Sequence, residues 1–271
     1  KVMETAEKLD AIVMVHCEMG DAIEELKRIL SSESKRDVRY HPVSRPSGLE
    51  AAAVKRVLEL SEKSGCRVYI VHLSSKSGLS AVSDARHKHI YVETCPHYLI
   101  FDESRYLLPD YDKASSYVMS PPLRSTVDRE ALWQGIEDHR IDVIATDHCP
   151  FKKEDRQEYR DDFFYKIPNG AGGVEERIGL VYTHGVRTGR VDMRRFVELI
   201  ATNPAKIFGL FPNKGVIRRG ADADLVIWDP AYSRKISAAT HRQASDINIY
   251  EGFETVGKVK TVIIGNRIIR I

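Results

Sequence analysis

The sequence predicts an α/β fold in which a parallel sheet is followed by a small β domain. Short apolar runs rich in β-branched residues alternate with stretches of helical periodicity through the first three quarters of the chain. This order is typical of parallel strands that are joined by crossover helices. After residue 220 the pattern changes, because two strand-like runs follow each other without a helix between them.

Three predicted strands each lead directly into a residue type that binds metal, namely His16, His72 and Asp147. Continuous apolar runs of this kind are typical of strands buried on both faces of a parallel sheet. In an α/β barrel the catalytic residues lie at the carboxyl ends of the strands. A single histidine after a strand is more often structural, but two histidines and a carboxylate form a common ligand set for Zn²⁺. The three strand ends therefore predict a metal-dependent enzyme.

The elements follow one another as repeated strand–helix units. The predicted strands of the sheet cover residues 11–15, 67–71, 89–94 and 142–146. The predicted helices cover residues 1–9, 21–30, 49–64, 79–87, 128–139, 174–186, 194–201 and 204–208. A charged loop rich in aromatic residues and glycine covers residues 151–173, and long structured loops at strand ends are usually functional.

The chain is expected to contain two domains with a boundary near residue 213. Residues 1–212 form the first, and residues 213–271 form a small β domain with predicted strands at 224–228 and 259–264. The chain begins inside a predicted helix and ends in the strand-like run 262–271. An unpaired apolar edge strand invites aggregation, so we expect a sequence that is cut at both ends.

The composition excludes several classes of function. The 41 basic residues nearly balance the 39 acidic ones, which gives no support for nucleic-acid or membrane binding. No apolar stretch approaches the roughly 20 residues that span a bilayer. The four cysteines lack CxxC spacing and are not arranged as a disulfide framework, so we expect a reducing, cytoplasmic location.

Several motifs occur in a fixed order along the chain. They are residues 15–21 (VHCEMGD), 71–74 (VHLS), 93–99 (ETCPHYL), 119–124 (MSPPLR), 146–151 (TDHCPF), 169–177 (NGAGGVEER), 203–210 (NPAKIFGL) and 220–226 (GADADLV). Together they resemble the cyclic amidohydrolases, in particular the dihydropyrimidinase and D-hydantoinase branch. The resemblance covers essentially the whole chain, which makes it more specific than any single motif.

The resemblance implies a fold, a reaction and a set of roles. The fold is a (β/α)8 TIM-like barrel beside a small β-sandwich, of which this chain holds the C-terminal part of the barrel and part of the sandwich. The reaction is hydrolysis of a cyclic amide, a dihydropyrimidine or a hydantoin, by a hydroxide that bridges two divalent ions, expected to be zinc. By resemblance, His16 and His72 hold one ion, and Asp147 binds the other and is the general base. Ser120 and Asn169 position the substrate amide through backbone groups.

Other candidate residues rank lower. Cys149 and His148 flank Asp147 but are not ligands in the family pattern, and Cys17 and Met19 stand where that pattern has Ala and Asn. The loss of the Asn is expected to alter hydrogen bonding around the ligands. His41, in a His-Pro-x-x-Arg-Pro loop, is expected to have a surface role.

The resemblance also implies ligands that this sequence lacks at matching positions. The family site uses a His-x-His pair and a carboxylated Lys, and we expect all three upstream of residue 1. The only His-x-His pattern, residues 87–89, falls at a helix-to-strand junction and is a poor candidate. We therefore expect the chain alone to be inactive and the intact protein to be a homotetramer.

Two alternatives follow from the same resemblance. A non-catalytic dihydropyrimidinase-like protein keeps the fold without the metal ligands, and the presence of His16, His72 and Asp147 argues against it. Allantoinase and dihydroorotase are alternatives within the enzyme class, although residues 169–175 and 248–253 favour the hydantoinase branch. The sequence leaves open the choice between a dihydropyrimidine and a substituted hydantoin.

Overall fold

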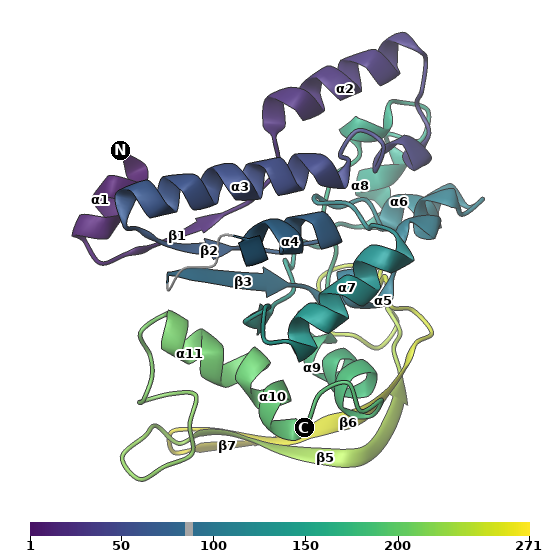
Figure 1. Cartoon of the computed structure of the whole chain (residues 1–271). Helices are drawn as coiled ribbons and strands as arrows, with labels where there is room; N and C mark the ends of the chain where they lie inside the picture. Colours follow the sequence, from purple (N-terminus) through teal and green to yellow (C-terminus); the bar gives the residue numbers. More distant parts are fainter. Residues whose placement is uncertain (85–88) are drawn as a thin grey trace.

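A computed structural model describes residues 1–84 and 89–271, and a four-stranded parallel sheet lies at its centre (Figure 1). The strands are β1 (Ile12–Val15), β2 (Arg67–Ile70), β3 (Ile90–Thr94) and β4 (Val143–Ile144), in that spatial order. Each pairs with its neighbour in parallel. The predicted parallel sheet is confirmed, although β4 is shorter than predicted.

Helices connect these strands as the sequence predicts. The longer ones are α1 (Val2–Lys8), α2 (Gly20–Ser32), α3 (Ser47–Ser64), α4 (Lys76–Asp84) and α7 (Thr126–Glu137). Short helices are α5 (Pro96–Ile100), α6 (Tyr111–Ser116), α8 (Lys153–Gln157), α9 (Arg177–Val181), α10 (Met193–Val197) and α11 (Asn203–Ile207). The 3-10 turns are η1 (Val38–Tyr40), η2 (Glu103–Leu107) and η3 (Phe164–Lys166), and the π-helical turns are η4 (Tyr182–Val186) and η5 (Glu198–Thr202). The predicted end of the fourth helix, and His87 of the His-x-His pattern, lie outside the described residues.

Alternating side chains of β2 face two different helical layers. Val68 and Ile70 belong to the main buried cluster, which also includes Leu58 of α3 and Leu79 of α4. Tyr69 points to the opposite face, where a second cluster joins it to α11. Figure 1 shows α3 and α4 on one side of the sheet and α10 and α11 on the other. Both faces of the central strands are therefore covered.

The strand β1 differs from the prediction of burial on both faces. It lies at the edge of the sheet, and its Met14 side chain is 53% exposed. An apolar run cannot reveal from sequence alone whether its strand lies in the middle or at the edge of a sheet. The central strand β2 fits the prediction better, because Val68, Tyr69 and Ile70 are all at most 1% exposed.

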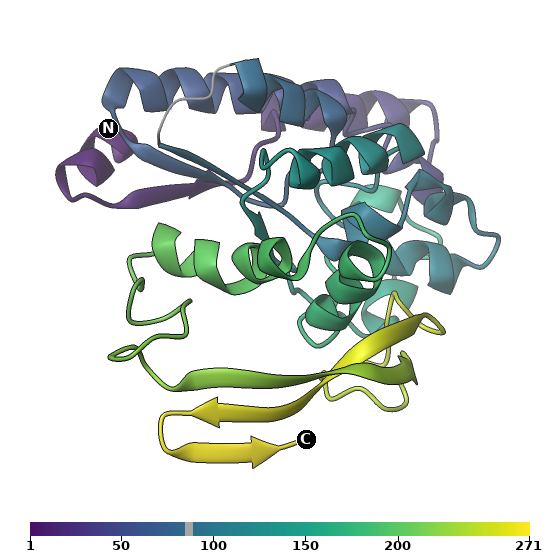
Figure 2. The same cartoon turned by 60° about the horizontal axis from the view of Figure 1, so that its bottom comes forward.

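A separate antiparallel sheet forms the last layer of the molecule (Figure 2). It contains β5 (Asp224–Lys235), β6 (Glu254–Ile264) and β7 (Arg267–Arg270), in the order β5-β6-β7. The run 262–271, predicted to be strand-like throughout, turns back at Gly265, which has a positive φ of 59°. The segments before and after this turn pair as a β-hairpin of β6 and β7. Glycine adopts this backbone conformation readily, which explains the turn.

The small sheet packs against the helices that follow β4. The Tyr182 ring meets the Trp228 ring of β5 edge to face, with centroids 5.2 Å apart. Thr183 accepts a hydrogen bond from the Val256 amide at 2.9 Å. Ile236 and Tyr250 belong to the same buried cluster as the strands of the parallel sheet. One continuous apolar core therefore spans both sheets.

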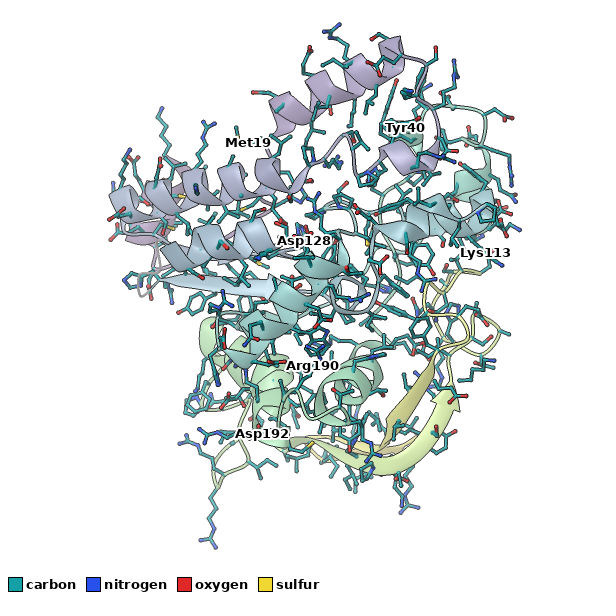
Figure 3. The ribbon with its side chains drawn as sticks, turned by 45° about the vertical axis from the view of Figure 1, so that its right-hand side comes forward. Met19, Tyr40, Lys113, Asp128, Arg190 and Asp192 are labelled. Carbon is teal, nitrogen blue, oxygen red and sulfur yellow. The ribbon has the colours of Figure 1, made fainter. Side chains whose placement is uncertain are left out.

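Two smaller features complete the fold. Asp128, labelled in Figure 3, caps α7 together with Ser125 and also accepts a hydrogen bond from the Lys76 amide at 2.9 Å, which joins α7 to α4. The predicted loop 151–173 contains the short elements α8 and η3. Across the described residues, no helix has the length and apolar character needed to cross a membrane.

Candidate functional site

The structure brings His16 and His72 together at the carboxyl edge of the parallel sheet. They follow the adjacent strands β1 and β2, in which Val15 pairs with Ile70. His16 Nδ1 lies 3.0 Å from His72 Nε2, and the two rings meet edge to face with centroids 4.8 Å apart. Two ligands of one tetrahedral zinc, each at about 2.0–2.1 Å, are separated by about 3.3 Å. The facing nitrogens share a hydrogen bond in this structure, and their separation is close to that of two ligands of one ion.

The environment keeps His72 in the neutral form that binds metal. Its side chain is buried, and burial together with the neighbouring His16 lowers the pKa of His72 to about 4, although the charge of Asp147 opposes this shift. Its Nδ1 atom is buried and has no hydrogen-bond partner among the described residues. A neutral imidazole offers a lone pair at neutral pH, as metal binding requires.

Asp147 lies at the same edge of the sheet but does not complete a three-residue cluster. It follows β4, is exposed, and acts on His72 through its charge. Within the described part of the chain, no group of three or more His, Cys, Asp or Glu residues is arranged to hold a metal ion. The structure thus pairs the two histidines and leaves the carboxylate beside them.

The backbone at two of the three strand ends is strained. His72 has a φ of 40° and Asp147 a φ of 45°. Residues other than glycine rarely adopt positive φ, and such conformations cluster at functional sites. Both residues leave their strands in this conformation, which turns the chain sharply at the edge where the site lies.

A carboxylate that the sequence analysis missed supports His16. Glu18 Oε2 lies 3.0 Å from His16 Nε2 and 2.5 Å from Arg45 Nη1, and the Glu18 side chain is 2% exposed. Burial alone raises the pKa of such a carboxyl, but the hydrogen bond with His16 and the charge of Arg45 outweigh it and hold the pKa of Glu18 below its usual value. A carboxylate on the outer nitrogen of a histidine is a common support for a metal ligand.

A second buried carboxylate fixes the backbone of His72. Glu93 of β3 accepts a hydrogen bond from the His72 amide at 3.2 Å and another from the Tyr69 hydroxyl at 2.6 Å. The ETCPHY motif contains Glu93, but nothing in the spacing of the motif reveals that Glu93 contacts the neighbouring strand β2 and His72. The contact of Glu18 with His16 could have been predicted more easily than that of Glu93. Glu18 is only two residues after His16 in the sequence, so its carboxylate can reach the His16 ring.

The two predicted substrate-binding residues are in direct contact. The Ser120 hydroxyl donates a hydrogen bond to Asn169 Oδ1 at 2.6 Å, and Asn169 Nδ2 donates to the Ile167 carbonyl at 2.8 Å. The Gly170 amide donates to the Val118 carbonyl at 2.9 Å, which joins the same two loops. Residues that lie 49 positions apart in the chain are thus held as one unit.

Buried side chains fix the Ser120 loop from behind. His41 Nε2 lies 2.7 Å from the Met119 carbonyl, and the Tyr98 hydroxyl donates to the Pro121 carbonyl at 2.6 Å. The expected surface role of His41 is wrong, because its side chain is 1% exposed. The loop that carries it folds inward between η1 and α3, a path that the polar sequence of residues 31–47 does not reveal.

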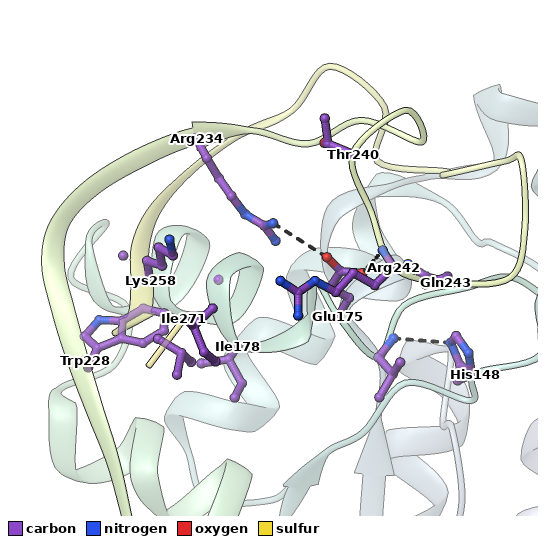
Figure 4. Close-up of a pocket in the computed structure, with 14 residues that line it drawn as sticks. His148, Glu175, Ile178, Trp228, Arg234, Thr240, Arg242, Gln243, Lys258 and Ile271 are labelled. Atoms are coloured by element: carbon purple, nitrogen blue, oxygen red, sulfur yellow. Dashed lines mark hydrogen bonds and ion pairs between the residues drawn. The ribbon is translucent and has the colours of Figure 1, made fainter. Parts of the chain in front are cut away.

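One cavity of the described structure lies away from these residues. Its volume is about 680 Å³, and it lies between α9 and the small sheet (Figure 4). His148, at its rim, accepts hydrogen bonds from the amides of Gly173 and Val174 at 3.1 and 3.3 Å. This contact gives His148 a structural role.

Comparisons with known proteins connect this geometry to a family. The D-hydantoinase of Geobacillus stearothermophilus is 39% identical over 97% of this chain and 56% of its own length. The D-hydantoinase of Ralstonia pickettii is 39% identical over 99% and 59%. The crystal structure of dihydropyrimidinase from Brevibacillus agri NCHU1002 matches with a TM-score of 0.96 and 35% identity, over all of this chain and 59% of that one.

These matches place the fold in the TIM-barrel-like α/β class. The chain spans between half and three fifths of the length of these relatives. The model of the amidohydrolase family matches residues 1–269, so this chain belongs to the amidohydrolase family.

Proposed function

We propose that this chain carries part of the active site of a metal-dependent cyclic amidohydrolase that opens dihydropyrimidine or hydantoin rings. The observation that carries the proposal is the pair of facing imidazole nitrogens, 3.0 Å apart, at the carboxyl edge of the sheet. The similarity to proteins named D-hydantoinase and dihydropyrimidinase supports the choice of substrate class.

In this proposal His16 and His72 hold one divalent ion, and Asp147 binds a second ion and is the general base. Zinc is the expected metal, because imidazole and carboxylate without thiolate suit it. When bound, the ions lower the pKa of water and polarise the amide carbonyl. The Asp147 carboxylate then accepts the proton of the attacking water and transfers it to the leaving ring nitrogen.

Ser120 and Asn169 orient the ring amide through backbone groups of their loops. Their mutual hydrogen bond supports this role, because it fixes two segments relative to each other before a substrate arrives. His41 and Tyr98 keep the Ser120 loop in place through its carbonyl groups.

We further propose that β1 to β4 are the C-terminal half of a (β/α)8 barrel and that residues 213–271 form part of a β-sandwich. The match to 59% of the dihydropyrimidinase chain supports this arrangement. A homotetramer, as expected for the resembling branch, is part of the same proposal. The four cysteines are all free, which supports a cytoplasmic location.

The direct test is a chimera in which residues 1–271 replace the matching segment of the Geobacillus stearothermophilus D-hydantoinase. The purified, metal-loaded chimera is assayed with dihydrouracil, hydantoin, allantoin and dihydroorotate. We expect ring opening of dihydrouracil or hydantoin and its loss in the His72→Ala chimera. A folded, metal-loaded chimera that opens none of the four rings would contradict the proposal.

The isolated 271-residue chain is the control for this experiment. We expect it to be inactive toward the same substrates, because its described residues do not bring three ligands together. Turnover of dihydrouracil by the isolated chain would show that the site in this chain is sufficient.

A further inference from the structure

A buried ion pair lies directly behind His16, on the side away from His72. Glu18 Oε2 is shared between His16 Nε2 at 3.0 Å and Arg45 Nη1 at 2.5 Å. The side chains of Glu18 and Arg45 are 2% and 15% exposed, so water does not screen this pair effectively. The two residues are 27 positions apart, and Arg45 comes from the loop between η1 and α3.

The geometry selects one tautomer of His16. A carboxylate can only accept a hydrogen bond, so the contact with Glu18 places the proton on Nε2. The neutral ring then carries its lone pair on Nδ1, the atom that faces His72. Glu18 therefore leaves free the nitrogen that would bind the ion.

Glu18 can fulfil this role only with a counter-charge. A carboxylate buried without a partner is strongly unfavourable, and it would protonate or move toward solvent. Arg45 supplies the positive charge at 2.5 Å. A guanidinium keeps its charge at any ordinary pH, so the ionised Glu18 carboxylate always faces a positive charge.

Arg45 is itself held in place by Arg124. The buried Arg124 guanidinium donates one hydrogen bond to the Arg45 carbonyl and another to the Ser74 hydroxyl, the latter at 3.1 Å. Ser74, two residues after His72, donates in turn to the buried carboxylate of Glu50 at 2.8 Å. The loop of Arg45 is thus anchored to the segment that follows the second histidine.

We propose that Arg45 is a positioning residue that acts through Glu18 to hold His16 in its metal-binding tautomer and orientation. This inference rests on the proposed metal site and adds a residue to it that touches neither metal nor substrate. Residues that orient a ligand in this way typically change metal affinity 10–100-fold when they are removed.

The first test measures Co²⁺ binding to the 271-residue chain by calorimetry and visible absorption. We expect Arg45→Met to weaken binding about 10–100-fold and Arg45→Lys to recover part of the loss. The matched control is Arg39→Met, because Arg39 lies in η1, directly before the loop of Arg45, and pairs with Asp37 at the exposed surface. Equal affinities of Arg45→Met and Arg39→Met would overturn the inference.

The second test needs no substitution and is therefore independent of folding defects. Long-range ¹H–¹⁵N spectra of the metal-free chain report the tautomer of His16 at neutral pH. We expect the Nε2–H form, and a dominant Nδ1–H form would overturn the inference. If the unsubstituted chain binds no Co²⁺, the same comparison is made in the D-hydantoinase chimera, which supplies the remaining ligands. A chimera that also binds no Co²⁺ would show that the proposed metal site itself is wrong, which distinguishes that failure from a failure of Arg45 alone.

Discussion

Two histidines of this chain, His41 and His97, have pKa values that are lowered by their buried surroundings. His41 is buried, and burial lowers its pKa to about 4, while the Met119 carbonyl acts against this shift. His97 is also buried, and burial together with the charge of His72 lowers its pKa to about 3. Both rings are therefore neutral in the folded protein over the ordinary pH range. In the unfolded chain the same rings take up a proton near pH 6.5.

The first prediction concerns acid stability. Between pH 6.5 and 4 the unfolded state binds a proton at residue 41 that the folded state does not, so the free energy of unfolding falls as the pH falls. His41 contributes about 2–3 kcal/mol to this loss at pH 4.5. His41→Gln keeps a donor for the Met119 carbonyl and removes the titration, so the variant should lose less stability between pH 7 and 4.5. Urea unfolding at both pH values measures this.

His89→Gln is the matched control for this prediction, because His89 is exposed. It should keep the pH dependence of the unsubstituted protein. An unchanged pH dependence in His41→Gln would show that His41 is already protonated in the folded state.

The second prediction concerns the contact between Ser120 and Asn169. Their 2.6 Å hydrogen bond should appear as a coupling energy of about 1 kcal/mol in a double-mutant cycle with Ser120→Ala and Asn169→Ala. Chemical unfolding of the four proteins gives this value. Strict additivity of the two substitutions would mean that this side-chain hydrogen bond does not form in solution.

At the scale of elements, packing decides what the local sequence cannot. Gly48 in α3 and Gly135 in α7 are both helical glycines. A Cβ at position 48 has no atom within 4 Å, whereas a Cβ at position 135 would lie 2.6 Å from Leu79 Cδ2. Leu79 is 1% exposed, and Ile141 Cδ1 would also lie 3.2 Å from that Cβ, so buried side chains surround the position. The glycine at 135 therefore permits the close approach of α4 and α7.

The third prediction follows from this contrast. Gly48→Ala should stabilise the protein by up to about 1 kcal/mol, because alanine lowers the entropy of the unfolded chain. Gly135→Ala should destabilise it by about 1–3 kcal/mol through overpacking. Thermal unfolding of both variants measures the difference. A gain in stability at position 135 would contradict the described packing of α7 on α4.

The sequence predicts an element well where the residues of that element themselves favour its structure. The strands β1, β2 and β3 lie within one residue of their predicted positions, because β-branched runs favour strands wherever they are placed. The place of β1 in the sheet depends instead on its pairing with β2, which lies far along the chain. The same reason separates His16 and His72, which a strand-end pattern reveals, from Arg45, whose role depends on a contact 27 positions away.

At the scale of the whole molecule, the two sheets share one apolar core. Trp133 of α7 and Tyr250 near the small sheet belong to the same buried cluster, and Trp228 of β5 packs against it. Nothing in the predicted boundary near residue 213 indicates this continuity. A shared core makes separate unfolding of the two parts unfavourable, since each would expose apolar surface of the other.

The fourth prediction uses the only two tryptophans of the chain, which lie in different layers. Trp133→Phe leaves a reporter in the small sheet, and Trp228→Phe leaves one beside the parallel sheet. The single fluorescence transition of each variant should coincide with its own loss of helical circular dichroism. If Trp228 fluorescence changes before the helices unfold, the small sheet unfolds independently.

The central claim is that His16 and His72 hold one divalent ion between them, and its most direct test is the number of Co²⁺ ions bound per purified chain. We expect one ion per chain, with binding lost in His72→Ala and kept in His148→Ala, whose side chain makes structural hydrogen bonds outside the pair. Unchanged Co²⁺ binding in a folded His72→Ala protein would contradict the account.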